Sequence, residues 1–574
     1  MGICGIIGGK GIYLIMDKKK IISIAIISVT MIVGIALRLL YLHTDLWYDE
    51  ACSWFTAKQL FPMGIMGNLL NLDLQHTPLY FFLLHLWIKL FGDSEIAMRS
   101  LSLLFGIGAL PLVFTATKKI ADNKTAIFAL ALACISPLLV LFSVEVRMYP
   151  MVIFLVILSL NYLIDFEKTR ETKALIKLGI TNILIPYTLI GGILYNIALW
   201  ATYSTYLYAE NKKDFFKYLK GLSAELIGLI PYFALIIYYA KMRSVFVISH
   251  EGVLTFFQVV DVIRNFFGAT IEKNIYWPSL EPYQITFLFA LLVVVPCVYF
   301  IYGYIQGLKK TEGFLNILYK IFLTSFGLSL VFSIFEINVF TVRYILYLVI
   351  PMFILAIIGL FKTLPTKHVE RFLIIFIIAC GIFNYINAKE FKILKTLSFK
   401  TVRIEADKLN LGVDDVIIMP FGADAPYYFR DLYSPRVFDF DVHKEIRNPH
   451  NNHYYDSEQQ EDIIQRPAII IYNSVMSDKV FSKNFFDYFM KNVNESVPRG
   501  RYVLIAMYGT DINFVTDIQS LRNSISGDYD VPARKLEIMF KKYLCDVSAM
   551  LNLNFVPVKT FKQDNYTFFL YRKI

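Results

Sequence analysis

Residues 21–42 read IISIAIISVTMIVGIALRLLYL and contain a single charged side chain, Arg38. About 20 consecutive apolar residues let a helix cross the hydrocarbon core of a bilayer, so this stretch predicts a transmembrane helix. The basic residues Lys18–Lys20 precede it and no secretory cleavage pattern follows it, which favours a retained anchor over a signal peptide. Met16 is a second candidate for the start of the chain.

The composition extends this interpretation to the whole chain. Of its 574 residues, 56% are hydrophobic and 18% are charged, against roughly 45–50% and about 25% in ordinary soluble proteins. This indicates a membrane protein. The formal net charge of +10 is typical of basic cytoplasmic loops, and no nucleic-acid partner is expected. The six cysteines are scattered without metal-type spacing, so no disulfide framework is predicted.

Ten further apolar runs bring the expected number of spans to about eleven. They lie at 96–117, 125–143, 148–164, 178–192, 193–209, 222–240, 285–305, 321–336, 344–361 and 371–388. Lys and Arg concentrate in every second connecting loop, which places the amino terminus in the cytoplasm by the positive-inside rule. The alternate loops then face outward: 43–95, 144–147, 241–284, 337–343 and everything after about 389.

One hydrophobic segment is not counted as a span. Residues 76–92, HTPLYFFLLHLWIKLFG, are short for a crossing and carry His85 and Lys89. Counting them would reverse the orientation of every later loop. The segment is therefore predicted to be an amphipathic helix in the plane of the membrane interface.

Beyond Lys389 the apolar runs shrink to the length of strands. The strand-like runs are DDVIIMPFG, RPAIIIYNS, RYVLIAMYG, NFVPVKTF and YTFFLYRKI, and two segments, KVFSKNFFDYFMKNV and ARKLEIMFKKYLCDVSAMLNL, are helix-like. This pattern predicts a soluble α/β domain at 389–574, after a cytoplasmic segment 1–20 and a transmembrane domain 21–388. The charge rule places the α/β domain outside the cytoplasm, and the richness in Ile, Lys and Asn favours a multi-pass protein of a prokaryotic plasma membrane.

Charged and polar side chains collect in the outer loops. They are Asp49, Glu50 and His76 in the first loop, Glu145 and Arg147 at 144–147, and Arg343 and Tyr344 at the last outer turn. Charges at membrane depth are costly unless paired or hydrated, so they indicate a functional site. Transfer of a group from a lipid phosphate uses such a set, because a partly desolvated carboxylate can take the proton of an attacking hydroxyl and Arg binds the departing phosphate bidentately.

Each of these residues also has a structural interpretation. Asp49 or His76 could cap a helix. Glu145 and Arg147 could form an interfacial ion pair, and Arg343 could be a flanking residue that reaches toward the headgroups. Two other function classes stay open as well: a transporter or flippase of lipid-linked saccharides, which would be expected to show an internal repeat, and a membrane-anchored binding protein. Clustering of the acids at one face favours the transferase.

Four stretches stand in a distinctive order along the chain: DLWYDEACS, HTPLYFFLLHLWIKLFGDSEIAMRSLSLLFG, SPLLVLFSVEVRMYP and FTVRYILYLVIP. Together they resemble the GT-C superfamily of polyprenyl-phosphate-sugar transferases, and within it glycosyltransferase family 39, which holds protein O-mannosyltransferases and lipid A aminoarabinose transferases. The resemblance covers roughly residues 20–390. It implies a polytopic helical enzyme, with amphipathic helices in its first outer loop, that moves a sugar from a polyprenyl-phosphate donor to an acceptor hydroxyl outside the cytoplasm.

The resemblance also implies roles for individual residues. Asp49 matches the candidate base of an Asp-Glu motif, with Glu50 as a secondary acid, and Glu145 matches an acid of the second outer loop. The residues expected near the donor are Arg147, Tyr149, Arg343, Tyr344 and His76. Thr77 replaces the first proline of the family's usual His/Lys-Pro-Pro. The sequence leaves open the sugar, the acceptor (a protein, a glycolipid or a wall polymer) and any need for a divalent metal.

Overall fold

The computed structural model describes residues 5–7, 12–14, 18–71, 76–245, 254–268, 290–334, 339–394, 400–411, 415–420, 425–428, 438–439, 468–472, 497, 499–508, 555–563 and 566–574. The chain divides into two compact units. The membrane unit comprises Met1–Thr44 and Thr56–Phe391, and the carboxy-terminal unit comprises Asp45–Phe55 and Lys392–Ile574.

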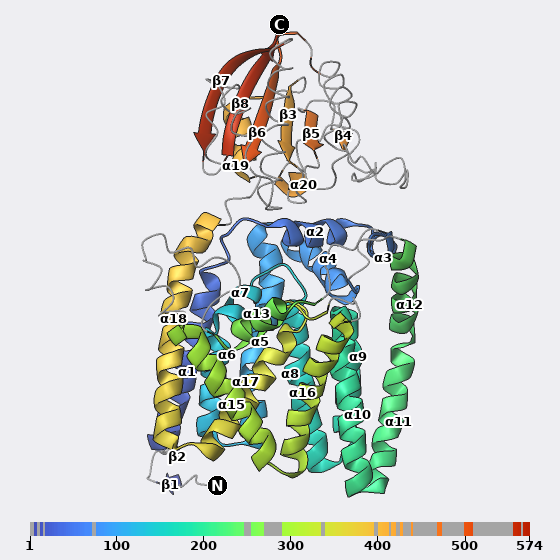
Figure 1. Cartoon of the computed structure of the whole chain (residues 1–574), viewed down its shortest axis with the longest axis vertical. Coiled ribbons are helices and arrows are strands. Elements are labelled where there is room, and N and C mark those ends of the chain that lie inside the picture. Colours follow the sequence, from blue (N-terminus) through green and yellow to red (C-terminus); the bar gives the residue numbers. More distant parts are fainter. Residues whose placement is uncertain are drawn as a thin grey trace. The chain divides into compact units, whose positions relative to one another are not determined.

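Helices that run side by side make up most of the membrane unit (Figure 1). A short hairpin of β1 (Gly5–Ile7) and β2 (Ile12–Leu14) precedes them. The helices are α1 (Lys18–Leu39), α3 (Met63–Asn71), α4 (Leu79–Phe91), α5 (Glu95–Ile120), α6 (Asn123–Ile135), α7 (Pro137–Phe142), α8 (Tyr149–Thr169), α9 (Thr172–Thr188), η1 (Ile190–Gly192), α10 (Ile193–Glu210), α11 (Lys212–Gly228), α12 (Ile230–Val245), α13 (Phe256–Phe267), η2 (Ala290–Val294), α15 (Val295–Lys310), α16 (Gly313–Ile334), η3 (Leu346–Leu348), α17 (Val349–Thr363) and α18 (Thr366–Leu394).

Within the described ranges, six helices are long and apolar enough to cross a bilayer, or seven if the bent pair Lys212–Gly228 and Ile230–Lys241 is one span. The six are Ile21–Leu39, Glu95–Ile120, Tyr149–Thr169, Leu291–Lys310, Gly313–Ile334 and Leu346–Thr363. The prediction of a polytopic helical membrane protein is thereby confirmed, while the total of about eleven spans stays a prediction. The segment 76–92 forms α4, a helix of 13 residues, which is shorter than a span needs.

The structure corrects the prediction of a loop between residues 209 and 222. Lys212, Lys213, Lys217 and Lys220 lie on α11 rather than in a loop. The physical reason is the cap, because the side chain of Asn211 accepts hydrogen bonds from the N–H groups of Lys213 and Asp214 and so starts the helix directly after α10.

The predicted span 125–143 is broken into α6 and α7 at Pro137. A proline has no N–H, so carbonyl groups in the preceding turn lose their helical partners. Arg38 of α1 donates to two of these carbonyl oxygens at 2.8 and 3.0 Å, and Asn384 of α18 donates to that of Ile135 at 2.6 Å. Side chains of neighbouring helices can satisfy broken backbone at membrane depth in this way. The one charge of the opening stretch therefore has a structural role.

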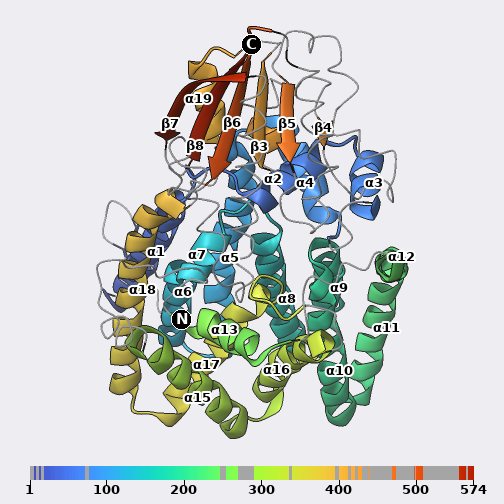
Figure 2. The same cartoon turned by 45° about the horizontal axis from the view of Figure 1, so that its top comes forward.

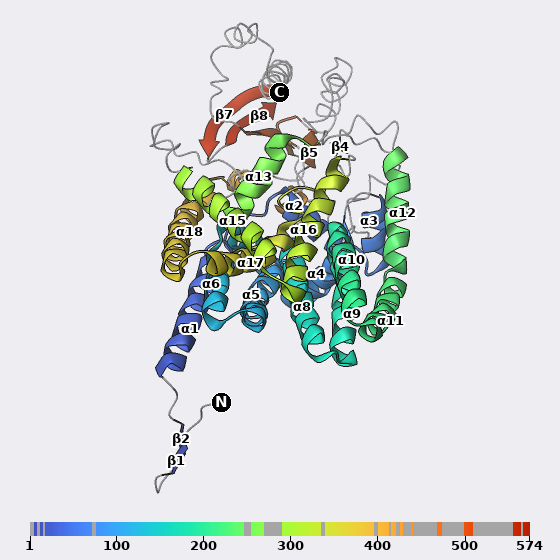
Figure 3. The same ribbon diagram turned by 60° about the horizontal axis from the view of Figure 1, so that its bottom comes forward.

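The close approach of α15 and α17 depends on glycine. A Cβ atom added at Gly359 of α17 would lie 1.8 Å from the carbonyl oxygen of Gly303 on α15. Gly303 and Gly307 stand four positions apart, the spacing that lets membrane helices pack with their backbones in contact. The helix α13 contacts both members of this pair and lies beside α15 (Figure 3).

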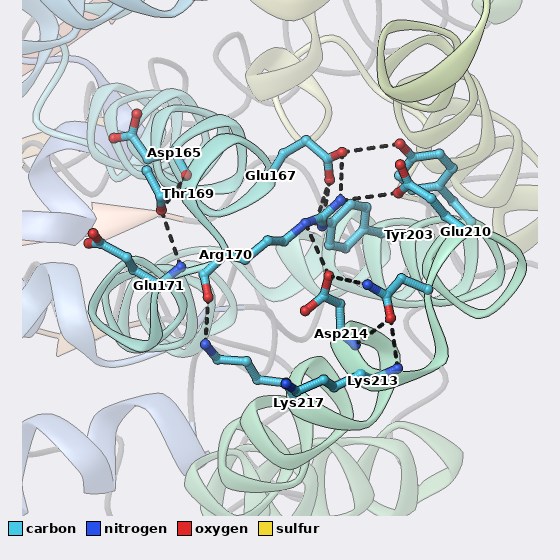
Figure 4. Close-up of polar contacts among 12 residues, drawn as sticks. Asp165, Glu167, Thr169, Arg170, Glu171, Tyr203, Glu210, Lys213, Asp214 and Lys217 are labelled. Atoms are coloured by element: carbon cyan, nitrogen blue, oxygen red, sulfur yellow. Dashed lines mark hydrogen bonds and ion pairs between the residues drawn. The ribbon is translucent and has the colours of Figure 1, made fainter.

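Arg170 ties together the ends of α8, α10 and α11 (Figure 4). It follows α8 in a left-handed conformation, with φ of 54°, and its guanidinium group pairs with Glu167, Glu210 and Asp214 at 2.9, 3.1 and 3.5 Å. Burial acts to lower the pKa of Arg170, but Tyr203 and the three acids outweigh it, so that the pKa is raised. Within this cluster, Arg170 and the three acids form ion pairs with one another, which gives these charges a structural role.

The carboxy-terminal unit contains a six-stranded sheet of order β4-β5-β3-β6-β8-β7, whose strands lie side by side in Figure 2. Its strands are β3 (Val416–Pro420), β4 (Phe438–Asp439), β5 (Ala468–Tyr472), β6 (Tyr502–Tyr508), β7 (Phe555–Gln563) and β8 (Tyr566–Lys573), and its short helices include α19 (Lys400–Lys408) and α20 (Ala425–Tyr428). The strands β4, β5, β3 and β6 pair in parallel. Strand β8 is antiparallel to both of its neighbours, β6 and β7. The five predicted strands are thus β3, β5, β6, β7 and β8. The two helix-like segments, 479–493 and 533–553, lie outside the described residues.

Candidate functional site

A buried turn between α7 and α8 carries Glu145 and Arg147. Both residues are almost fully buried, with exposed fractions of 5% and 4%. Arg147 donates from Nη2 to Nε2 of His76 at 2.6 Å, since a guanidinium group has only donors and the imidazole nitrogen must accept. His76 is buried as well. The structure therefore brings together two of the predicted donor-binding residues.

The local sequence explains this turn. The carbonyl of Glu145 accepts from the N–H of Arg147 at 2.7 Å, a three-residue turn. Pro150 then fits the first turn of α8, where its missing N–H costs nothing. Tyr149 opens α8 and packs edge-on against Phe142 of α7, with 5.4 Å between ring centroids. The guanidinium carbon of Arg147 lies 5.9 Å from the centroid of the Tyr149 ring, within the range of a cation–π contact.

Two further helices hold the turn from behind. Ser102 of α5 donates from its hydroxyl to the carbonyl oxygen of Arg147 at 3.2 Å. The Ser102 hydroxyl also lies 2.8 Å from the hydroxyl of Tyr80 on α4. All three residues are buried, so this chain of hydrogen bonds fixes the backbone of Arg147 to the helix that follows His76.

The backbone of His76 is fixed from another direction. Tyr239 of α12 donates from its hydroxyl to the carbonyl oxygen of His76 at 2.9 Å, and Phe81 of α4 packs edge-on against the imidazole at 6.0 Å. Because Nε2 accepts from Arg147, the ring proton in this contact resides on Nδ1. His76 thus presents an acceptor to Arg147 and a donor on its other side.

Arg343 and Tyr344 lie in the turn before η3, as the sequence predicted. The Ser333 hydroxyl accepts from the N–H groups of Val339 and Phe340 at 3.0 and 2.7 Å, which fixes the start of this segment. The carbonyl oxygen of Tyr344 would lie 3.7 Å from a Cβ atom at Gly191 of η1. Both predicted side chains are partly exposed.

Asp49 and Glu50 lie on α2 (Tyr48–Lys58), in its first turn. Their segment belongs to the carboxy-terminal unit, where Lys400 pairs with Asp45 at 3.1 Å and Tyr427 packs edge-on against Trp54 at 5.4 Å. Glu50 is fully buried and accepts from the N–H of Trp47 at 3.2 Å. A carboxylate that reaches back to this amide stabilises the amino end of a helix, so Glu50 has a capping role. Asp49 is partly exposed.

Comparisons with known proteins agree with this architecture. Residues 75–238, which include His76, Glu145 and Arg147, match the family described as Dolichyl-phosphate-mannose-protein mannosyltransferase. Crystal structures of ArnT from Cupriavidus metallidurans are similar in fold. The apo form has a TM-score of 0.52 and 10% sequence identity, over 96% of this chain and 98% of that one, and the form bound to undecaprenyl phosphate has a TM-score of 0.51 and 11% identity over the same shares.

An oligosaccharyltransferase from Archaeoglobus fulgidus, tethered to an acceptor peptide, is similar over 97% of this chain and 74% of that one, with a TM-score of 0.50 and 10% identity. No curated protein sequence matches the chain. The chain therefore shares the fold of these transferases, and residues 75–238 match the mannosyltransferase family.

The sequence did not predict the residues that hold the site residues in place. Tyr239, Tyr80 and Ser102 carry no motif, and they are recognised only by what they contact. In the described parts of the chain, no group of three or more His, Cys, Asp or Glu side chains is placed to hold a metal ion. The four described cysteines, Cys52, Cys134, Cys297 and Cys380, form no disulfide.

Proposed function

We propose that the protein is a GT-C glycosyltransferase that moves a sugar from a polyprenyl-phosphate donor to an acceptor hydroxyl at the extracytoplasmic face of the plasma membrane. The observation that carries the proposal is the buried contact between Arg147 and His76. The hydrogen bond to His76 orients the guanidinium group of Arg147 without neutralising its charge, and the planar fork of an arginine matches phosphate oxygens. ArnT, which shares the fold, has been solved with undecaprenyl phosphate bound.

The other predicted residues complete the donor contacts. Arg343 is proposed as a second cation for the phosphate, and Tyr149 and Tyr344 as neighbouring contacts to the donor. An arginine on each of two turns suits a phosphate that gains charge as it leaves, because preorganised cations stabilise charge that develops in the transition state.

The proposed reaction is an attack on the anomeric carbon. The oxygen of the acceptor hydroxyl forms a bond to that carbon, the bond from the carbon to the phosphate oxygen breaks, and polyprenyl phosphate leaves with the electron pair. Asp49 takes the hydroxyl proton as general base. Glu145, on the same turn as Arg147, is proposed as the second catalytic carboxylate. The products are a glycoside and polyprenyl phosphate.

The partners follow from this chemistry. The donor reaches the protein from the lipid phase, and the acceptor is a protein, a glycolipid or a wall polymer. The carboxy-terminal unit, predicted to lie outside the cytoplasm, is proposed to recognise the acceptor.

The test is to incubate the purified enzyme with a panel of polyprenyl-phosphate sugars and to follow free polyprenyl phosphate and new glycosides by mass spectrometry. We expect turnover of at least one donor, and a loss of about 10²-fold or more in Arg147→Ala. The matched control is Lys124→Ala, which removes an exposed ion pair with Glu370 and should leave turnover unchanged. Movement of an intact lipid-linked sugar across vesicles, without cleavage, would instead establish a flippase.

A further inference from the structure

Thr77 carries a hydroxyl group that the structure leaves unused. Its side chain is fully buried, and Oγ1 has no hydrogen-bond partner among the described residues. Burial of a hydroxyl without a hydrogen bond is unfavourable, so nearly all such groups in native proteins are satisfied. A buried, unsatisfied hydroxyl directly after His76 therefore points to a partner from outside the protein.

The position of this hydroxyl is fixed on both sides. On one side, the carbonyl of His76 accepts from Tyr239 at 2.9 Å. On the other, the carbonyl of Pro78 accepts from the N–H of Phe82 at 3.0 Å and so starts α4. A β-branched side chain also has few rotamers. The hydroxyl is thus held in place before any ligand arrives.

The amino end of α4 adds a second feature that favours an anion. Pro78 is the N-cap residue and makes no side-chain capping bond. The N–H groups of the first helical turn have no acceptor within the helix, and together with the helix dipole they favour negative charge at this end. Thr77 precedes this end directly. One residue earlier, Nε2 of His76 accepts a hydrogen bond of 2.6 Å from Nη2 of Arg147.

We propose that the Thr77 hydroxyl donates a hydrogen bond to a phosphate oxygen of the lipid-linked donor, beside Arg147 and the amino end of α4. This assigns a specific donor contact to the position at which this sequence departs from His/Lys-Pro-Pro, where a proline would offer no side-chain donor. The inference rests on the proposed function. It adds a residue that reads the phosphate itself rather than the sugar.

The test compares Thr77→Val, which keeps the shape and removes the hydroxyl, with Thr77→Ser, which keeps the hydroxyl. Two quantities are measured on the full-length protein: the dissociation constant for undecaprenyl phosphate, and the thermal midpoint without ligand. The matched control is Thr117→Val on α5, because Thr117 is equally buried but donates to the carbonyl of Val113 at 2.8 Å.

If the Thr77 hydroxyl contacts the ligand, Thr77→Val should keep or raise the thermal midpoint. If the hydroxyl supports the fold, the same change should lower it. We expect Thr77→Val to weaken undecaprenyl phosphate binding by about 10-fold while its thermal midpoint stays equal or rises, because an unsatisfied buried hydroxyl has been removed. Thr77→Ser should bind within about 3-fold of the unmodified protein, and Thr117→Val should bind like it.

Unchanged binding in Thr77→Val would overturn the inference while leaving the proposed function intact. A fall in thermal midpoint that accompanies weaker binding would also overturn it, since the hydroxyl would then support the fold. If the unmodified protein neither binds undecaprenyl phosphate nor turns over any donor in the panel, the proposed function itself is wrong.

Discussion

Arg147 and His76 stand 71 positions apart in the sequence and are joined by a hydrogen bond of 2.6 Å between Nη2 and Nε2. A buried hydrogen bond to a charged group is worth about 1.5–3 kcal/mol. Each of the two side chains is therefore oriented by the other. A substitution at one residue should change the contribution of the other to donor binding.

The first prediction is energetic coupling between these two residues. Arg147→Ala should weaken undecaprenyl phosphate binding by about 10- to 100-fold, because a bidentate cation is lost. His76→Ala should weaken it less, and should have little further effect when Arg147 is already Ala. A double-mutant cycle on the dissociation constants measures this, with an expected coupling of about 0.5–3 kcal/mol. Strictly additive effects would show that His76 does not act through Arg147.

The second prediction concerns Arg343. Arg343→Lys keeps the positive charge but loses the planar fork that matches phosphate oxygens, so donor affinity should fall about 10-fold. Steady-state kinetics with the natural donor, together with direct binding of undecaprenyl phosphate, will measure it. Unchanged affinity in both Arg343→Ala and Arg147→Ala would remove the support for two arginines at the phosphate.

The sequence predicts the helices and strands of this protein better than the tertiary contacts between them. Apolar length predicts the long helices, and the five strand-like runs predict five of the strands, because both signals are local. The bond from Tyr239 to His76 joins residues 163 positions apart, and no local pattern specifies it. The grouping of Asp45–Phe55 with the carboxy-terminal unit is likewise a tertiary property, which depends on contacts such as that of Trp54 with Tyr427.

Glu50 illustrates the same limit within one helix turn. The sequence predicted Glu50 to be a secondary acid beside Asp49, whereas the hydrogen bond from the N–H of Trp47 to the Glu50 carboxylate gives Glu50 a role in helix capping. Thr77 is the converse case. Its departure from a motif was visible in the sequence, but the unsatisfied hydroxyl that gives it meaning required the structure.

The third prediction is the topology. The loop charges predict that a cysteine placed near Asn494 will react with a membrane-impermeant thiol reagent in intact cells or spheroplasts, and that a cysteine near Lys310 will react only after the membrane is permeabilised. Labelling is read by a mass shift on a background without native cysteines. The reverse pattern would place the carboxy-terminal unit in the cytoplasm and contradict the proposed extracytoplasmic site.

The fourth prediction concerns helix packing. Gly359→Ala should lower the thermal midpoint markedly, because its Cβ atom would lie 1.8 Å from the carbonyl oxygen of Gly303, and backbone cannot move aside as a flexible side chain can. The matched control is Gly327→Ala on α16, where a Cβ atom would meet nothing within 4 Å. That change should be neutral or stabilising by up to about 1 kcal/mol, since Ala is the better helix former. Equal midpoints for the two variants would show that α15 and α17 do not pack through glycine.

The fifth prediction separates the two acids of α2. Asp49 follows the first span in an aromatic surround of Trp47 and Trp54, and as the proposed base it should be needed for proton removal. Asp49→Asn should reduce turnover by about 10²–10⁴-fold and leave undecaprenyl phosphate binding and the thermal midpoint near those of the unmodified protein. Glu50→Gln keeps an oxygen that can accept from the N–H of Trp47, so its turnover should change by less than about 10-fold. Glu50→Leu removes that acceptor and should lower the thermal midpoint. An Asp49→Asn protein that binds donor and transfers sugar at close to the unmodified rate would exclude Asp49 as the base, and Glu145 would then be the carboxylate to test in its place.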